Sequence, residues 1–430
     1  MTAHHETRLY LAAHPVVYPL MRLLARLGPV VRVPGVGVVV NDAATAREVL
    51  MDERFRKDGP GSPGDLWTPV LGPSVLLNME GEAHAALRRK LAPLFTPAQV
   101  ASLVSGVLEA PLAGLSARLA RGETVDLVDE MRLMAGAVIC RLIGMGEVAP
   151  EDARSLFADG ERIVSMVSLR SRRLSERQIA AARQVLDRIG DIAVAAYERG
   201  DESTVMGRMR ALGLSAAEAR GAAGAFFLTG TETVATFVPR LVALLHDTGS
   251  RVEGPGVALL HDTGSRVEGP GVALLHDTGS RVEGPGELDR AIEEAMRVTT
   301  PTPVMLRSVA APARVGGVAV RPGDRIVIAT HNCARAYGPF DLSAKHPPEL
   351  RRLWFGAGPH FCIGYPLALA EIRAVAGVVL SHDVRVVRRS AARGVLIPTY
   401  AHLWITSGAR RDPTRAGEGS KARKGSEADE

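Results

Sequence analysis

The sequence predicts a mainly α-helical fold with a small β region. Residues 96–210 alternate helical patterns with short polar breaks, and residues 215–246 form a long helical pattern dense in Ala and Leu. Short β-branched segments with glycine turns lie at 30–40 and 318–328. At 430 residues the chain could hold two or three ordinary domains, although a single large helical domain is also possible.

Composition indicates a packed globular protein with an aliphatic core. Hydrophobic residues make up 46% of the chain and charged residues 23%, whereas aromatic residues account for only 4%. The net charge of +5 is mild for this length, so we expect no nucleic-acid partner. We find no run that approaches the roughly 18 apolar residues needed to span a bilayer, so we expect a soluble chain with no membrane association.

The three cysteines, Cys140, Cys333 and Cys362, are an odd number and lie far apart in the sequence. None has the paired spacing of a zinc site or a disulfide framework, so we expect a reducing, cytoplasmic compartment. Cys140 lies in an apolar helical pattern and is interpreted as a core thiol.

The N-terminal region mixes helical and β patterns. Residues 19–27 have helical apolar spacing, residues 30–40 predict a hairpin, and residues 41–53 predict a capped helix. Residues 57–73 are rich in Gly and Pro around one large ring, Trp67, which predicts a flexible loop. Further on, residues 318–328 predict a second hairpin, built around a Pro-Gly turn.

Three short patterns combine residue types that suit chemistry. His84 and Arg88 share one helical face, which suits a carboxylate ligand, although a solvated basic face is the alternative. Residues 230–233 place a glycine and three polar side chains inside an apolar helix, a violation of propensity that is expected at functional sites. Glu294 and Arg297 are three apart on one helical face, a weak signal by itself.

The stretch of residues 354–364 carries the strongest signal. Closely spaced glycines allow a tight turn around Cys362, and Pro366 begins a helix directly after it. A sulfur at the positive end of a helix has a lowered pKa, and a thiolate is a soft metal ligand, so we expect a metal-binding cysteine. A buried free cysteine in a Gly-rich turn is the alternative.

An unusual feature is a 15-residue unit, 242–256, repeated without substitution at 257–271 and 272–286. Identical copies indicate recent tandem duplication, so we expect the two extra copies to form a surface insertion. The recurring histidines, His246, His261 and His276, suggest a metal site only weakly, because duplication copies histidines without selecting a geometry. The C-terminal residues 409–430 have no apolar face and predict a disordered tail.

The cysteine stretch resembles the haem-binding loop of the cytochrome P450 family, Phe-x-x-Gly-x-x-x-Cys-x-Gly, written here as Phe355, Gly358, Cys362 and Gly364. The resemblance covers roughly residues 15–408 and implies a single-domain P450 fold over 1–408, mainly α with a small β region. It implies haem b as cofactor, with Cys362 as the axial ligand of its iron. The other residues that the resemblance assigns to cofactor binding are His84, Arg88, Arg307, Phe355, Gly356, His360 and Gly364.

The same resemblance assigns the remaining candidate residues. Thr233 is expected to supply an alcohol at the dioxygen site and Glu232 the acid that feeds protons, while Thr229 stands where the family usually has Ala. Glu294 and Arg297 match the structural Glu-x-x-Arg pair, whose usual third partner is unclear here, with Lys345, Arg351 and Arg352 as candidates. The residues expected to line the substrate pocket are Trp67, Thr229, Val304 and Met305.

The resemblance implies a monooxygenase that inserts one oxygen atom into a mostly apolar small molecule, in secondary metabolism. It implies a monomer that receives NAD(P)H-derived electrons from a ferredoxin and its reductase. Oxidative coupling, desaturation or rearrangement of a biosynthetic intermediate, and non-catalytic haem-thiolate ligand binding, remain alternatives.

Overall fold

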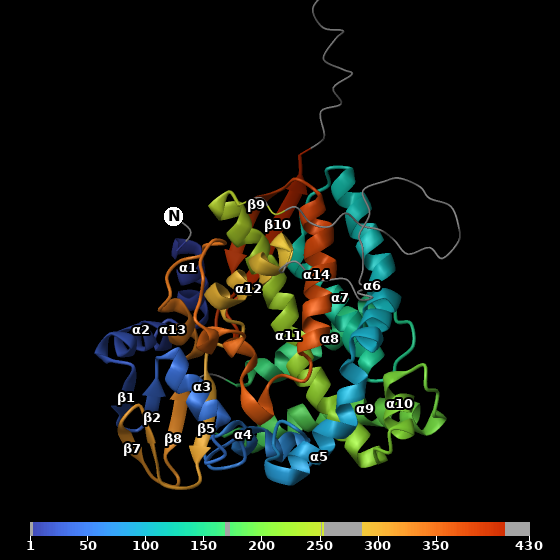
Figure 1. The fold of residues 1–430 in the computed structure, drawn as a ribbon. Coiled ribbons are helices and arrows are strands. Elements are labelled where there is room, and N and C mark those ends of the chain that lie inside the picture. The colour runs from blue at the N-terminus through green and yellow to red at the C-terminus, as the bar shows by residue number, and fades with distance from the viewer. Residues whose placement is uncertain (1–2, 168–172, 251, 253–285, 409–430) are drawn as a thin grey trace, which may run out of the picture.

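The computed structural model describes residues 3–167, 173–250, 252 and 286–408 (Figure 1). The expected tail at 409–430 and the two extra repeat copies lie outside the described residues, apart from Gly286. The helices are α1 Ala3–Ala13, α2 Val17–Leu27, α3 Ala43–Met51, α4 Pro63–Leu71, α5 Gly81–Leu91, α6 Pro97–Ala120, α7 Leu127–Leu142, α8 Pro150–Ser165, α9 Glu176–Arg199, α10 Val205–Ala211, α11 Ala216–Thr248, α12 Glu287–Thr299, α13 Thr330–Arg335 and α14 Tyr365–Ser381.

The strands form three small sheets within the described residues. The largest has the order β1-β2-β8-β5-β3, the second β4-β10-β9, and the third pairs β6 with β7. Their bounds are β1 Val30–Val33, β2 Gly37–Val40, β3 Phe55–Arg56, β4 Val125–Asp126, β5 Met305–Val309, β6 Ala313–Val315, β7 Val318–Val320, β8 Arg325–Ile328, β9 Val384–Ala391 and β10 Tyr400–Ser407. The mainly helical fold with a small β region is confirmed.

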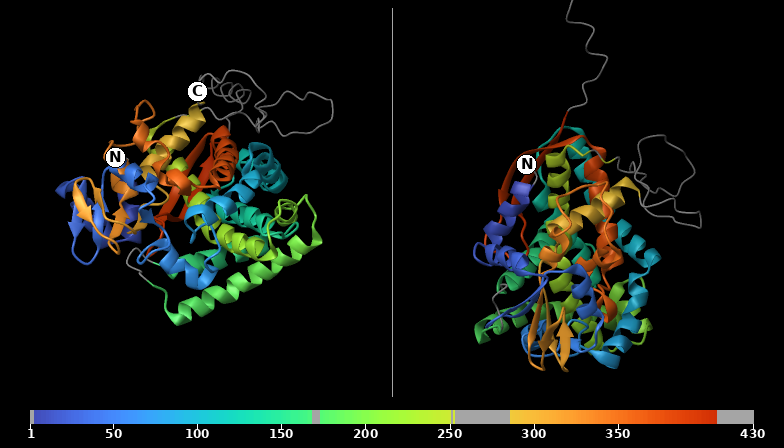
Figure 2. Two further views of the ribbon diagram at one scale, coloured as in Figure 1. Left: turned by 60° about the horizontal axis from the view of Figure 1, so that its bottom comes forward. Right: turned by 60° about the vertical axis from the view of Figure 1, so that its left-hand side comes forward.

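The helices gather in a large layer beside the five-stranded sheet, and α11 runs through the middle of that layer next to α14 (Figures 1 and 2). Helix α11 packs against α7, α8, α9, α12 and α14, so most of its second half is buried on all sides. It begins with a capping box between Ser215 and Glu218 and ends at Gly249, which adopts the left-handed conformation. Its last two turns come from the first repeat copy, and Val242, Ala243, Leu244 and Leu245 are buried there.

The N-terminal helix is fastened to the centre of the protein by buried charges. Arg240 of α11 is 1% exposed and forms an ion pair with Glu6 of α1, while its guanidinium also donates to the Pro398 carbonyl at 3.0 Å. The Tyr10 hydroxyl of α1 donates to the Thr299 carbonyl at 2.6 Å, and His14 contacts the Leu396 carbonyl at 2.9 Å. Helix α1 and the following His14 therefore tie the segment around Leu396 to α11.

Two local predictions are wrong. Residues 57–73 do not form a plain loop, because Pro63 begins helix α4, which packs closely enough that a Cβ on Gly64 would lie 2.6 Å from the Lys57 carbonyl. The Pro322-Gly323 turn does exist, with the Asp324 amide donating to the Arg321 carbonyl. Its flanking strands do not pair with each other: β7 pairs with β6, whereas β8 pairs with β2 and β5.

One helix among the described residues, α6, is long and apolar enough to cross a membrane by length and composition alone. We did not predict this helix as a possible span from the sequence, because Ala, Gly and Ser interrupt its large apolar residues without adding charge. One face of α6, from Val100 to Leu119, is buried where the helix packs against α7 and α14. A core helix passes the same test, so α6 is weak evidence for a membrane span.

Candidate active site

The loop that carries Cys362 is shaped by two left-handed glycines. Gly356 has φ +82° and Gly358 has φ +63°, and a Cβ on Gly358 would lie 2.9 Å from the Leu50 carbonyl of α3. The Cys362 amide then donates to the Phe355 carbonyl at 2.9 Å, which closes the loop just before α14 begins. The sequence therefore positions a single sulfur at the start of a helix.

The pKa of Cys362 corrects one expectation. Burial raises the pKa of the thiol above its ordinary value, although the amides of Gly364 and Tyr365 and the charges of Arg88 and Lys57 act to lower it. The helix start therefore does not by itself produce a thiolate. A coordinated metal ion removes the proton from a thiol outright, so the ligand role does not depend on that start.

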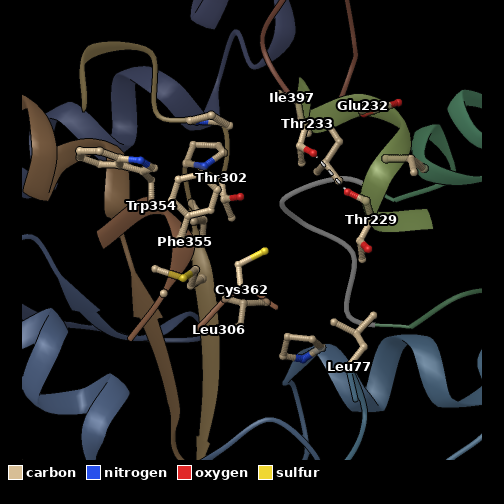
Figure 3. Close-up of a pocket in the computed structure, with 18 of the residues that line it drawn as sticks. Leu77, Thr229, Glu232, Thr233, Thr302, Leu306, Trp354, Phe355, Cys362 and Ile397 are labelled. Atoms are coloured by element: carbon tan, nitrogen blue, oxygen red, sulfur yellow. Dashed lines mark hydrogen bonds between the residues drawn. The ribbon is translucent and has the colours of Figure 1, made fainter. Parts of the chain in front are cut away.

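The sulfur faces a cavity of about 850 Å³ that lies between the Cys362 loop and α11. In Figure 3 the Cys362 side chain points into the open centre, with Trp354 and Phe355 on one side and Thr229 and Thr233 on the other. The expected pocket residues Trp67, Thr229, Val304 and Met305 all line this cavity, as do Gly356 and Gly364. Most of the lining is aliphatic or aromatic, which suits an apolar ligand.

The cavity face of α11 carries two hydroxyl groups one turn apart. Thr229 donates to the Ala225 carbonyl at 2.7 Å, and Thr233 donates to the Thr229 carbonyl at 3.2 Å. Gly230 lies between them, and a Cβ there would come within 2.8 Å of the Ile139 side chain of α7. With their hydrogens used inside the helix, both hydroxyls present acceptor lone pairs to the cavity.

Glu232 also borders the cavity but turns its carboxyl group away from Cys362, toward the far side of α11 (Figure 3). Burial raises the pKa of Glu232 to about 8, helped by the charge of Glu161 and opposed by that of Arg132. Arg132 and Glu161 pair at 2.9 Å and are each about one-third exposed. The carboxyl group is therefore protonated at neutral pH and lies near a charge pair that reaches solvent.

Basic side chains gather at the other end of the cavity. The His360 Nε2 atom lies 2.7 Å from Glu80, and the His360 ring packs against His84 with centroids 4.2 Å apart. Arg307 lines the main cavity, whereas His84 and Arg88 line a smaller neighbouring cavity of about 330 Å³. Burial, with the nearby cations, lowers the pKa of His84 to about 4, and burial lowers the pKa of Arg307 to about 10. The region is thus short of negative charge.

Comparisons with known proteins agree with this geometry. The cytochrome P-450 monooxygenase DoxA of Streptomyces sp. strain C5 is 29% identical over 390 residues, which cover 82% of this chain and 84% of DoxA. The 20-oxo-5-O-mycaminosyltylactone 23-monooxygenase of Streptomyces fradiae is 27% identical over 315 residues, 71% of this chain and 66% of that protein. This chain belongs to the cytochrome P450 family. The relatives are named monooxygenases, and this P450 is accordingly an oxidoreductase.

Solved structures support the fold of this P450. The crystal structure of CalO2 matches with a TM-score of 0.71 at 22% identity, covering 93% of this chain and 97% of CalO2. The structure of a mutant of P450 EryK in complex with erythromycin B matches with a TM-score of 0.70 at 20% identity. The match covers 93% of this chain and 97% of the EryK chain. No protein-family model matches the chain.

The residues of this P450 fit a haem. The cavity offers one sulfur ligand on one wall, and at its basic end the carboxylate of Glu80 is outnumbered by the cations Lys57, Arg88 and Arg307. The buried His360 Nδ1 atom and the Trp354 indole nitrogen have no hydrogen-bond partner among the described residues. A flat apolar group that carries carboxylates on one edge would satisfy these features, and a haem is such a group.

The Glu294–Arg297 pair of this P450 has a third partner that we did not predict. Arg297 donates to both oxygens of the Glu294 carboxylate, at 2.6 and 2.8 Å, and His346 contacts the same carboxylate at 2.8 Å. The candidates Lys345, Arg351 and Arg352 do not fill this position. Lys345 and Arg351 are exposed, and the Arg352 Nε atom lies 3.5 Å from a carboxylate oxygen of Glu293.

Four further residues were not singled out by sequence reasoning: Lys57, Glu80, His346 and Glu371. Lys57 and Glu371 line the main cavity, and burial raises the pKa of Glu371 to about 8. Glu371 lies two turns after Cys362 on an apolar helix, so a charged residue at a core position was a signal available in the sequence. Lys57 and Glu80 lie in irregular segments, where spacing carries no such signal.

Proposed function

We propose that this P450 is a haem-thiolate monooxygenase that inserts one oxygen atom into a mostly apolar secondary metabolite. The observation that carries the proposal is that the Cys362 sulfur and the Thr233 hydroxyl border one apolar cavity from opposite walls. Cys362 is the proposed iron ligand. Arg88, Arg307, His84 and His360 are the proposed partners of the haem carboxylates, and Phe355 the residue that packs beside the sulfur.

The bound haem supplies an iron at which dioxygen is activated, and a thiolate ligand favours cleavage of the O–O bond. Glu232 holds a proton at neutral pH because of its raised pKa, so it can act as a general acid. The Arg132–Glu161 pair offers a route by which Glu232 regains its proton from solvent. Thr233 fixes an acceptor oxygen near the reaction site, where it can hold a water molecule in the proton path.

The cavity supports a large apolar substrate. Its volume of about 850 Å³ is shared with the haem, and its other walls come from α2, α4 and the extended segment before β5. One relative is named for 20-oxo-5-O-mycaminosyltylactone, and one similar structure holds erythromycin B. We propose a substrate of comparable size from secondary metabolism. Coupling or desaturation in place of hydroxylation would be distinguished by product analysis.

We further propose that a ferredoxin and its NAD(P)H-dependent reductase supply electrons to a monomeric, cytoplasmic protein. Arg89 of α5 is 68% exposed near the cysteine side of the protein and offers a positive contact for an acidic partner, although it also pairs with Glu82. Reconstitution with a ferredoxin and its reductase tests this proposal. Turnover that does not depend on ionic strength would contradict an electrostatic encounter.

The deciding experiment is the carbon monoxide difference spectrum of the reduced, purified protein beside the Cys362→Ala variant. We expect a long-wavelength Soret band in the wild type that disappears in the variant. A wild-type protein that binds haem without this band would refute thiolate ligation. A wild-type protein that binds no haem would refute the proposed function altogether.

A further inference from the structure

Lys57 lies in the main cavity next to Arg307, and strand pairing explains why. Strand β3 pairs with β5 so that Phe55 faces Val309 and Arg56 faces Ser308. The next antiparallel pair in this register is Lys57 with Arg307. Both side chains line the cavity that also contains His360 and Cys362. The fold therefore sets two cations side by side in a largely buried position.

The nearby carboxylate does not pair with the Lys57 ammonium group. Glu80 accepts hydrogen bonds from His360 and from the backbone amide of Lys57, and no side-chain hydrogen bond or ion pair of Lys57 is found in the part of the chain that the structure describes. Burial lowers the pKa of Lys57 to about 7, with the Arg307 charge as the next cause. Two adjacent buried cations are unfavourable unless an anion lies between them.

Counting the charged side chains around Lys57 indicates how many negative charges a ligand would have to supply. Leaving the imidazoles aside, the cationic side chains of this cluster are Lys57, Arg88 and Arg307. Glu80 is the carboxylate that faces them. With Lys57 protonated, the cluster therefore carries an excess of two positive charges, and a haem has two propionate groups. Without Lys57 the same cluster would leave one propionate without a counter-charge.

We propose that Lys57 is a further cofactor-binding residue, whose ammonium group pairs with a haem propionate beside Arg307. Glu80 positions it, because this carboxylate holds both the Lys57 amide and the His360 ring. This inference rests on the proposed haem-binding function. The turn that follows Lys57 is closed by the Ser62 hydroxyl, which lies within hydrogen-bond distance of the Lys57 and Gly59 carbonyls.

The test uses the purified holoprotein and the variants Lys57→Met, Lys57→Arg and, as an exposed control, Lys345→Met. Haem loss is followed as transfer to excess apomyoglobin. Removing one charge-assisted hydrogen bond should accelerate haem loss roughly tenfold in K57M. K57R should lose haem at close to the wild-type rate, because arginine keeps the positive charge. K345M should lose haem at the wild-type rate.

A second readout separates propionate pairing from a structural role. The propionate bending bands in the resonance Raman spectrum should shift in K57M and stay unchanged in K345M, and the reduction potential of K57M should become more negative because a cation is lost. Unchanged haem loss and unchanged Raman bands in K57M would overturn the inference. A wild-type protein without haem would instead refute the proposed function.

Discussion

The Nε2 atom of His346 lies 2.8 Å from the Glu294 carboxylate, which Arg297 also holds by two hydrogen bonds. An imidazole thus completes a buried network in which we expected a guanidinium or an ammonium group. Arg297 extends the network by donating to the Ala334, Gly338 and Pro339 carbonyls. The network fixes α12 against the segment that leads into the Cys362 loop.

Replacing His346 by Ala should destabilise the protein by about 1–3 kcal/mol, because a buried carboxylate loses one of its partners. Urea unfolding measures the change. The matched control is His402→Ala, since His402 also pairs with a carboxylate, Asp126, but is 57% exposed. The control should change stability by less than about 0.5 kcal/mol. Equal losses in the two variants would contradict the role of His346.

The Glu232→Gln variant should slow product formation by about 100-fold, since an amide cannot act as a general acid. The wild-type rate should fall as the pH rises through about 8, where Glu232 loses its proton, and this decline should be absent in the variant. The rate of product formation, measured for both proteins between pH 6 and 9, checks both expectations. A variant that keeps the wild-type pH profile would show that another group supplies the proton.

Glu371 should make the folded state less stable as the pH rises. Its pKa is raised by burial to about 8, so between about 4.5 and 8 the folded state binds more protons than the unfolded state, and stability falls with rising pH. Glu371→Gln removes this dependence and should be more stable than the wild type at pH 8 by on the order of 3 kcal/mol. Urea unfolding of both proteins at pH 5 and pH 8 tests this prediction. An equal difference in unfolding free energy between variant and wild type at both pH values would contradict the raised pKa of Glu371.

The Glu6→Gln substitution should lower the free energy of unfolding by about 3–5 kcal/mol, because Arg240 would remain as a buried charge without its carboxylate. The control is Glu82→Gln. Glu82 pairs with the exposed Arg89, and loss of this ion pair should leave the free energy of unfolding almost unchanged. Since His14, directly after α1, also contacts the Leu396 segment that lines the cavity, ligand affinity should fall along with stability in the Glu6 variant. Unchanged stability would contradict the tie between α1 and α11.

Deleting residues 257–286 should leave the carbon monoxide spectrum and the melting temperature close to those of the full chain. Helix α11 ends at Thr248 and α12 begins at Glu287, so the deletion leaves residues 249–256 to connect them, a length common between packed helices. The spectrum and a thermal unfolding curve of the shortened chain provide the measurement. A gain of haem content on deletion would instead show that the extra copies impair folding.

The sequence was informative where one position had to satisfy a demanding chemical or conformational requirement. The Cys362 loop was found from its spacing because glycines such as Gly356 and Gly358 have conformations that other residues rarely adopt. Helix α4 was missed because Gly and Pro looked like loop signals, whereas Pro63 occupies a first turn. Lys57, Glu80 and His346 were missed because their roles arise from strand register and packing between segments far apart in the chain.

The position of the repeats has a genetic consequence. The first copy supplies the buried last turns of α11, and every copy ends in the same Gly-Pro-Gly that precedes Glu287 in the sequence. Gain or loss of whole 15-residue units therefore leaves both junctions with unchanged sequence, as long as one copy remains. Unequal recombination at this locus can therefore change the number of copies without changing any residue of the buried core.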